Sequence, residues 1–221
     1  MNTIYRYIPD TDWMTIILLF GLLLLAAGRS FFGDSFKTFL VVPFSNSYFA
    51  LSKKKSKMVR GFHWVLCLFQ ILNVSLFVVL ITTTLLDTTF AATPKVFGII
   101  LAGLAVFLTL KVVLQMGNGL FFDNQGLMTD IIFQKLTFFN YGGLISFVGN
   151  IFLIFIFQGN TALVYLMLFF LVLINGIGLV HILRNYQNLI VYKKFYFILY
   201  LCTLEIAPLA ILISYINSWI L

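Results

Sequence analysis

The sequence predicts an all-α protein, a polytopic bundle of about six transmembrane helices that forms a single membrane domain over residues 1–221. Hydrophobic residues make up 62% of the chain and charged residues 10%, whereas soluble proteins carry roughly 25% charged residues. Several apolar runs approach the about 20 residues that an α-helix needs to cross a bilayer. These runs are continuous and lack the alternating pattern of barrel strands, so helices are predicted.

Six apolar segments are predicted to span the membrane, at residues 13–28, 62–86, 96–116, 141–157, 161–183 and 196–219. The first resembles a secretory signal, but Asp10 and Asp12 precede it and a lysine-rich segment follows, which favours a retained helix. The first and fourth segments are short and need support from interfacial residues. Gln158-Gly159-Asn160 is a turn signal, which predicts that the fourth and fifth helices form an antiparallel hairpin.

Two connecting segments are too long to be simple turns. Residues 31–57 interleave aromatic with polar residues and end in a run of lysines, which predicts a segment lying in the cytoplasmic interface. That segment either binds anionic lipid or serves only as a topology signal. Gly117-Asn118-Gly119 is expected to end the third helix, because glycine readily adopts the left-handed cap conformation. Residues 117–140 are then expected to form a re-entrant or surface pair of helices.

The placement of positive charge predicts the orientation. Of the 14 Lys and Arg residues, all but Arg6 and Lys95 lie in or beside the segments that follow the first, third and fifth helices. Because cytoplasmic loops are enriched in Lys and Arg, these segments are placed in the cytoplasm. Both termini are therefore expected outside the cytoplasm.

No sequence motif identifies a reaction. The chain lacks the HExxH zinc motif, the Walker phosphate loop, the nucleophile elbow and any Cys/His metal spacing. Neither a cofactor nor a metal site is predicted, and the basic residues form no soluble face for nucleic acid. Cys67 and Cys202 both lie in apolar segments, which argues against a structural disulfide.

Glu205 is the clearest candidate for a functional residue, because it is the only glutamate and lies near the centre of the sixth predicted helix. A charged group at that depth costs about 2.5 kcal/mol or more. Pro208, three residues later, is expected to kink the helix beside the carboxyl group. Glu205 either binds a proton or substrate, or is a neutral acid that cross-bonds two helices.

Three asparagines are expected near the bilayer midplane together with Glu205, forming an intramembrane polar centre: Asn73, Asn150 and Asn175. Gln70 lies one turn from Asn73 on the same helix. Hydrogen bonds between transmembrane helices average about 0.6 kcal/mol, so this polar centre is either a site or simply a set of contacts that hold the helices together.

A candidate cationic pocket is expected nearer the cytoplasmic end, lined by His63, Lys111, His181 and Arg184. It would bind phosphate or carboxylate; alternatively, these long basic side chains reach outward to lipid headgroups. Small residues predict close helix packing, either within the bundle or against a partner helix. They are Gly98, Ala102, Ala105 and Thr109 on the third helix, and Gly142, Ser146 and Gly149 on the fourth.

The last predicted helix contains the sequence Leu-Tyr-Leu-Cys-Thr-Leu-Glu-Ile-Ala-Pro over residues 199–208. It resembles the C-terminal signature of domain of unknown function 4271, a family of uncharacterised multi-pass membrane proteins of Bacteroidota. Tyr200, Cys202, Glu205 and Pro208 fit that signature, whereas Ala207 replaces a bulkier residue. The resemblance implies the inner membrane of a diderm bacterium, in which termini outside the cytoplasm lie in the periplasm. It implies no reaction.

The sequence therefore favours a non-enzymatic membrane protein that scaffolds or assists an envelope process. Its expected partners are membrane lipid and other membrane proteins or a second copy of the chain. One alternative is a transporter-like protein that uses Glu205 for proton coupling and has a water-accessible path to it. The other is an enzyme acting on a lipid-linked substrate at the cytoplasmic face, in which the four residues of the cationic pocket converge.

Overall fold

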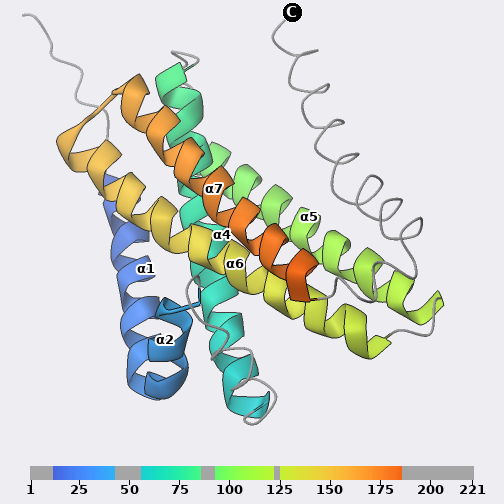
Figure 1. Cartoon of the computed structure of the whole chain (residues 1–221). Helices are drawn as coiled ribbons and strands as arrows, with labels where there is room; N and C mark the ends of the chain where they lie inside the picture. The colour runs from blue at the N-terminus through green and yellow to red at the C-terminus, as the bar shows by residue number, and fades with distance from the viewer. Residues whose placement is uncertain (1–11, 43–55, 86–92, 122–124, 186–221) are drawn as a thin grey trace, which may run out of the picture. The chain divides into compact units, whose positions relative to one another are not determined.

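The computed structural model describes residues 12–42, 56–85, 93–121 and 125–185, which are helical apart from short turns (Figure 1). Five of the described helices are long and apolar enough to cross a membrane, which confirms the predicted all-helical membrane fold. The sixth predicted span, with Glu205 and Pro208, lies outside the described residues. The elements are α1 (Asp12–Phe31), α2 (Gly33–Leu40), α4 (Ser56–Leu85), α5 (Pro94–Phe121), α6 (Gln125–Ile151), a π-helical turn (Phe152–Ile156) and α7 (Thr161–Asn185).

Contacts group the chain into two compact units. Unit 1 comprises Met1–Val106 and Leu136–Ile177, and unit 2 comprises Phe107–Lys135 and Gly178–Leu221. The single membrane domain expected from the sequence stays a prediction. The two units are therefore described one at a time.

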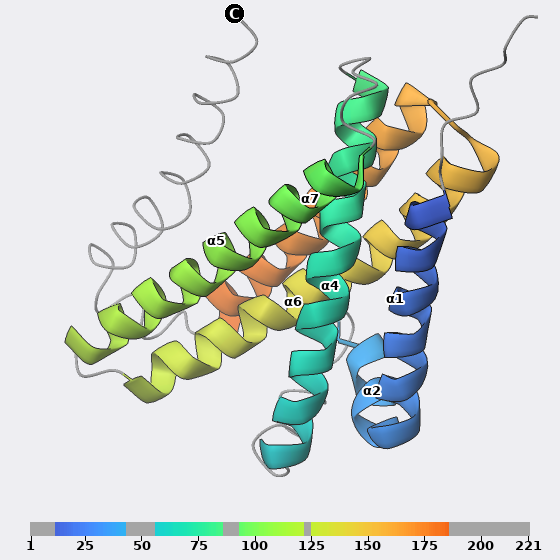
Figure 2. The same ribbon diagram turned by 180° about the vertical axis from the view of Figure 1, so that it is seen from behind.

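In unit 1, α1 packs along α4, and the short α2 lies against both helices (Figures 1 and 2). Phe62 at the start of the α4 span is fully buried. Three rings from the α1–α2 region surround it at centroid distances of 5.8–6.1 Å: those of Phe32, Phe36 and Phe39. Asp34 and Lys37 are exposed on the other face of α2. This part of the predicted interfacial segment is thus a short amphipathic helix packed on the end of α4.

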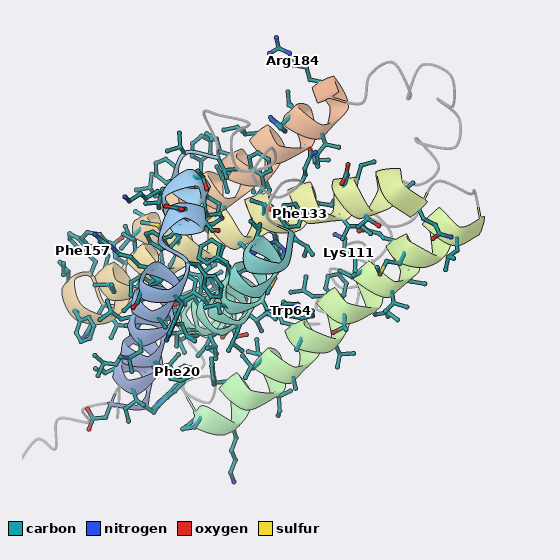
Figure 3. All side chains as sticks on the ribbon, turned by 90° about the horizontal axis from the view of Figure 1, so that it is seen from below. Phe20, Trp64, Lys111, Phe133, Phe157 and Arg184 are labelled. Atoms are coloured by element: carbon teal, nitrogen blue, oxygen red, sulfur yellow. The ribbon has the colours of Figure 1, made fainter. Side chains whose placement is uncertain are left out.

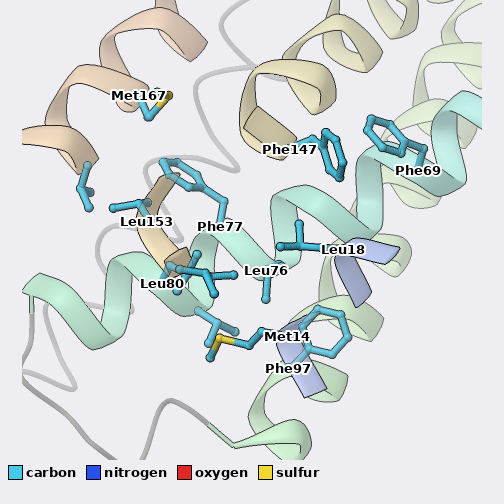
Figure 4. Close-up of a cluster of buried hydrophobic side chains, with 13 residues drawn as sticks. Met14, Leu18, Phe69, Leu76, Phe77, Leu80, Phe97, Phe147, Leu153 and Met167 are labelled. Carbon is cyan, nitrogen blue, oxygen red and sulfur yellow. The ribbon is translucent and has the colours of Figure 1, made fainter. Parts of the chain in front are cut away.

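The apolar core of unit 1 draws side chains from α1, α4, α5, α6 and α7 (Figure 4). Large apolar side chains also cover the outside: Phe20 is 48% exposed, Trp64 77% and Phe157 46% (Figure 3). Apolar surface on this scale would promote aggregation in water but suits contact with lipid. The exposed faces therefore agree with a membrane location.

The predicted hairpin between α6 and α7 is confirmed. Gly159 in the turn has a φ of +71°, a conformation that glycine adopts without steric cost. The Asn160 side-chain oxygen accepts a hydrogen bond from the Leu163 N–H at 3.2 Å and so caps the first turn of α7.

The boundary between α5 and α6 differs from the prediction. Helix α5 continues through Gly117 to Phe121, and α6 begins at Gln125, so the predicted helix end at Gly117-Asn118-Gly119 is wrong. The membrane-length segment begins at Met128 in α6 and ends at Ile156, the last residue of the π-helical turn. Residues 128–140 are therefore part of this long helix and form neither a re-entrant nor a separate surface helix.

The physical reason is that glycine inside a helix costs only about 1 kcal/mol, which packing can offset. A Cβ atom on Gly119 would lie 3.0 Å from the Cβ atom of Met128. This glycine therefore allows close approach of two helices and does not end one of them.

Candidate functional site: the polar interface between α4 and α6

Two rows of buried polar side chains face each other within unit 1. Helix α4 contributes His63, Gln70 and Asn73, and α6 contributes Asn140 and Asn150; each is at most 9% exposed. We call these five residues the α4–α6 polar interface. Their spacing of three to four residues, or multiples of it, keeps each row on one helical face.

Two hydrogen-bonding contacts join the two helices. The Asn150 side-chain amide donates to the backbone carbonyl of Asn73 at 2.9 Å. The Asn140 amide nitrogen lies 3.4 Å from Nδ1 of His63. In both pairs the α6 residue follows the α4 residue by 77 positions, so α4 and α6 run parallel. The two contacts are ten residues apart on each helix, roughly 15 Å along the axis.

Between these two contacts, the helices lie close together at Gly143. A Cβ atom there would lie 2.9 Å from both Cα and Cβ of Gln70, so a larger residue would collide with the backbone of α4. The glycine therefore sets the distance between the two helices, as small residues commonly do in membrane bundles.

Apolar groups enclose the Asn73 end of the interface. The rings of Phe69 and Phe147 lie 5.5 Å apart between centroids. A Cβ atom on Gly21 of α1 would come within 3.2 Å of the Asn73 amide nitrogen, which itself donates to the Phe69 carbonyl at 2.8 Å. The Asn73–Asn150 contact is therefore packed on several sides.

Several polar atoms of this interface have no hydrogen-bond partner in the part of the chain that the structure describes. They are Nε2 of Gln70 and the side-chain oxygens of Asn73, Asn140 and Asn150. A buried polar atom without a partner costs about 1–3 kcal/mol. These amide oxygens can accept hydrogen bonds from water or a polar ligand, and the Gln70 amide nitrogen can donate one. Across the described ranges, no three His, Cys, Asp or Glu side chains gather closely enough to hold a metal.

The structure brings together two members of the predicted polar centre, Asn73 and Asn150. Asn175 instead donates to the Leu171 carbonyl of its own helix at 2.7 Å, and its amide nitrogen faces Gly142. Glu205 and the adjoining Pro208 lie outside the described residues. The polar centre as a whole stays a prediction.

The predicted cationic pocket divides between the two units. His63 belongs to unit 1, where it is buried beside Asn140. Lys111, His181 and Arg184 belong to unit 2; the first two are half-buried, and Arg184 is exposed in the last turn of α7 (Figure 3). The convergence of all four residues stays a prediction.

Sequence reasoning missed Asn140 and Gly143. Their spacing with Asn150 matches one helical face, and that signal was present in the sequence. Placing the start of the fourth helix at residue 141 left Asn140 outside the helix. The neighbouring small-residue row of Gly142 and Gly149 instead faces α7, where a Cβ atom on Gly149 would lie 2.9 Å from the Met167 sulfur.

Among the described residues, five helices of membrane-spanning length and a buried amide interface define a multi-pass helical membrane protein. The chain matches the family described as Domain of unknown function (DUF4271) over residues 14–216 and belongs to that family. No curated protein and no solved structure was found to match it. The match ends at residue 216 and so includes the motif at residues 199–208 in the last predicted helix.

Proposed function

We propose that this chain is a non-enzymatic protein of the inner membrane that scaffolds or assists an envelope process, with both termini in the periplasm. The close packing of α4 and α6 carries the proposal. Gly143 lies directly against Gln70, and Asn150 bonds to the backbone of Asn73. Interfaces with small residues and interhelical amide bonds hold membrane helices in fixed positions, as a scaffold requires.

The outer faces support the same role. On α1, Ile16 is 66% exposed and Leu23 64%; on α7, Phe169 is 61% exposed and Val172 71%. These apolar faces suit contact with lipid or with helices of a partner. The proposed partners are therefore membrane lipid and other membrane proteins, or a second copy of the chain.

The Asn150→Leu variant tests the scaffold role, because it replaces the polar amide group with an apolar side chain. Membrane abundance and envelope integrity, scored as resistance of cells to detergent, are measured together. If the protein is a scaffold, envelope integrity should depend on the amount of protein in the membrane. A variant present at the normal level should therefore give normal envelope integrity. Loss of integrity at normal abundance would overturn the proposal. The Gly98→Ala variant is the control, because none of the residues that the structure describes lies within 4 Å of its new methyl group.

A second candidate function is a proton-coupled transporter-like protein that uses Glu205. The observation favouring it is the set of buried amide atoms of Gln70, Asn73, Asn140 and Asn150 that lack partners among the described residues. Such atoms would be satisfied by water or a polar substrate. The Glu205→Gln variant separates the two functions, because a transporter loses function at normal abundance and a scaffold does not.

A further inference from the structure

Within unit 2, one apolar face of α5 is exposed. Its large side chains are three or four positions apart, or multiples of that, and so share a face: Leu110, Val113, Leu114 and Leu120. Gly117 lies in the same row, and no atom of the described residues lies within 4 Å of the position of a Cβ atom on it. Only 6% of the apolar window in the membrane-length segment of α5 is buried, against 50% in the segments of α4 and α6. This face can therefore receive a further helix.

The rest of unit 2 contains a segment of suitable length and direction, because the unit extends over Gly178–Leu221. Residues 196–219 are predicted to form a spanning helix, and ten residues, 186–195, connect it to the end of α7 at Asn185. A connection of that length reaches at most about 33–36 Å. Since successive spanning helices cross a membrane in opposite directions, α5 and α7 run the same way. The predicted helix therefore runs antiparallel to α5 and begins on the side where α5 ends.

Lys111 lies beside this exposed face and inside the membrane-length segment Pro94–Gly117. It is half-buried, and both Leu110 and Leu114 next to it on the helix are exposed. Lys111 precedes the end of the segment by six residues, which is roughly 9 Å. Glu205 follows the start of the predicted helix by nine residues, roughly 13–14 Å from the same side. The flexible four-carbon stem of a lysine can span this difference in depth.

We propose that the predicted helix at residues 196–219 packs on the exposed face of α5, and that Glu205 forms an ion pair there with Lys111. Charged side chains within a bilayer are costly, and they pair with one another for that reason. Glu205 is the only glutamate of the chain, and Lys111 offers it the opposite charge at a similar depth. The pair holds the two helices together and does not depend on the scaffold role.

Disulfide formation tests the packing in the full-length protein in its membrane. Leu114→Cys is combined with Ile198→Cys after both native cysteines are replaced by alanine, and a protease site is inserted within residues 186–195. Ile198 precedes Glu205 by seven residues and so lies on nearly the same helical face. We expect oxidation to keep the two fragments joined after cleavage until a reductant is added. Tyr200→Cys replaces Ile198→Cys in the control and should not join them, because it lies about 160° around the helix from Ile198.

Two results would overturn the packing. One is joining by Tyr200→Cys that equals or exceeds joining by Ile198→Cys, or no joining by either. The other is a disulfide between two chains, seen as a dimer without reductant, because a second copy would then cover the face.

Exchange of the two charges tests the ion pair. Lys111→Glu and Glu205→Lys each place like charges together, so each should lower membrane abundance severalfold. The variant with both changes should recover most of the loss. Glu205→Lys combined with Lys95→Glu is the control and should not recover, because Lys95 is exposed at the other end of α5.

A neutral pair of variants covers the case in which the exchanged charges prevent folding. Lys111→Gln leaves Glu205 without its partner, so Lys111→Gln/Glu205→Gln should be more abundant than Lys111→Gln alone. The ion pair would be overturned if neither double variant were more abundant than its single variants, or if the Lys95→Glu control recovered equally. Neither measurement scores envelope integrity, so these outcomes are separate from those for the scaffold role.

Discussion

Asn150 joins two helices through one hydrogen bond, from its side-chain amide to the backbone carbonyl of Asn73. Replacing Asn150 with leucine removes the bond and should lower the free energy of unfolding by about 1 kcal/mol, within the range measured for membrane helices. Unfolding of the purified protein by titration with a denaturing detergent measures the change.

Asn175 provides the matched control for this prediction. Its amide bonds to the Leu171 carbonyl of its own helix, so Asn175→Leu removes no bond between the helices that the structure describes. We expect a smaller loss of stability than for Asn150→Leu. Equal losses in the two variants would contradict the assigned role of Asn150.

Depth in the membrane could be predicted for individual polar residues, but the helical face could not. Asn73 and Asn150 were expected at one level because apolar segments define the midplane. Asn175 was expected at the same level, yet it points toward Gly142. His63 was grouped with cations because of its depth, whereas its neighbour in unit 1 is the Asn140 amide. Which face meets which helix depends on packing, and hydropathy does not encode it.

The spacing between α4 and α6 rests on Gly143. In Gly143→Ala, the new methyl group would lie 2.9 Å from the Cα atom of Gln70, and backbone cannot move aside as a flexible side chain can. We expect the free energy of unfolding to fall by about 2 kcal/mol, as overpacked cores show. Thermal unfolding in detergent measures it.

Gly98→Ala is the control for Gly143→Ala, because no atom of the described residues lies within 4 Å of the position of its new Cβ atom. Alanine favours helix more than glycine does, so this variant should be unchanged or more stable by up to about 1 kcal/mol. If Gly143→Ala were as stable as Gly98→Ala, the close contact between α4 and α6 would be refuted.

Helix existence was predictable for all five described spans, whereas two helix ends were not. The turn at Gly159 could be predicted from the sequence, because Gln158 and Asn160 interrupt a long apolar run. The similar signal at Gly117-Asn118-Gly119 failed. There the glycine at 119 serves contact with Met128, and helix α5 continues to Phe121. A single sequence does not distinguish a glycine that allows close helix packing from a glycine that ends a helix.

The charge asymmetry of the whole chain predicts opposite locations for two exposed glutamines, Gln125 at the start of α6 and Gln158 in the turn before α7. Each is replaced by cysteine in a background of Cys67→Ala and Cys202→Ala. A membrane-impermeant thiol reagent should label Gln158→Cys in intact spheroplasts and Gln125→Cys only after permeabilisation. The reverse pattern would place both termini in the cytoplasm.

The central claim for the whole molecule is that the α4–α6 polar interface is a packed joint between helices of a membrane scaffold. The same cysteine-free background tests it with Asn150→Cys, and Gln158→Cys serves as the accessible reference. The claim predicts that a small water-soluble thiol reagent labels Asn150→Cys only after denaturation. Labelling of folded Asn150→Cys at a rate near that of Gln158→Cys would contradict it, because water would then reach the interface.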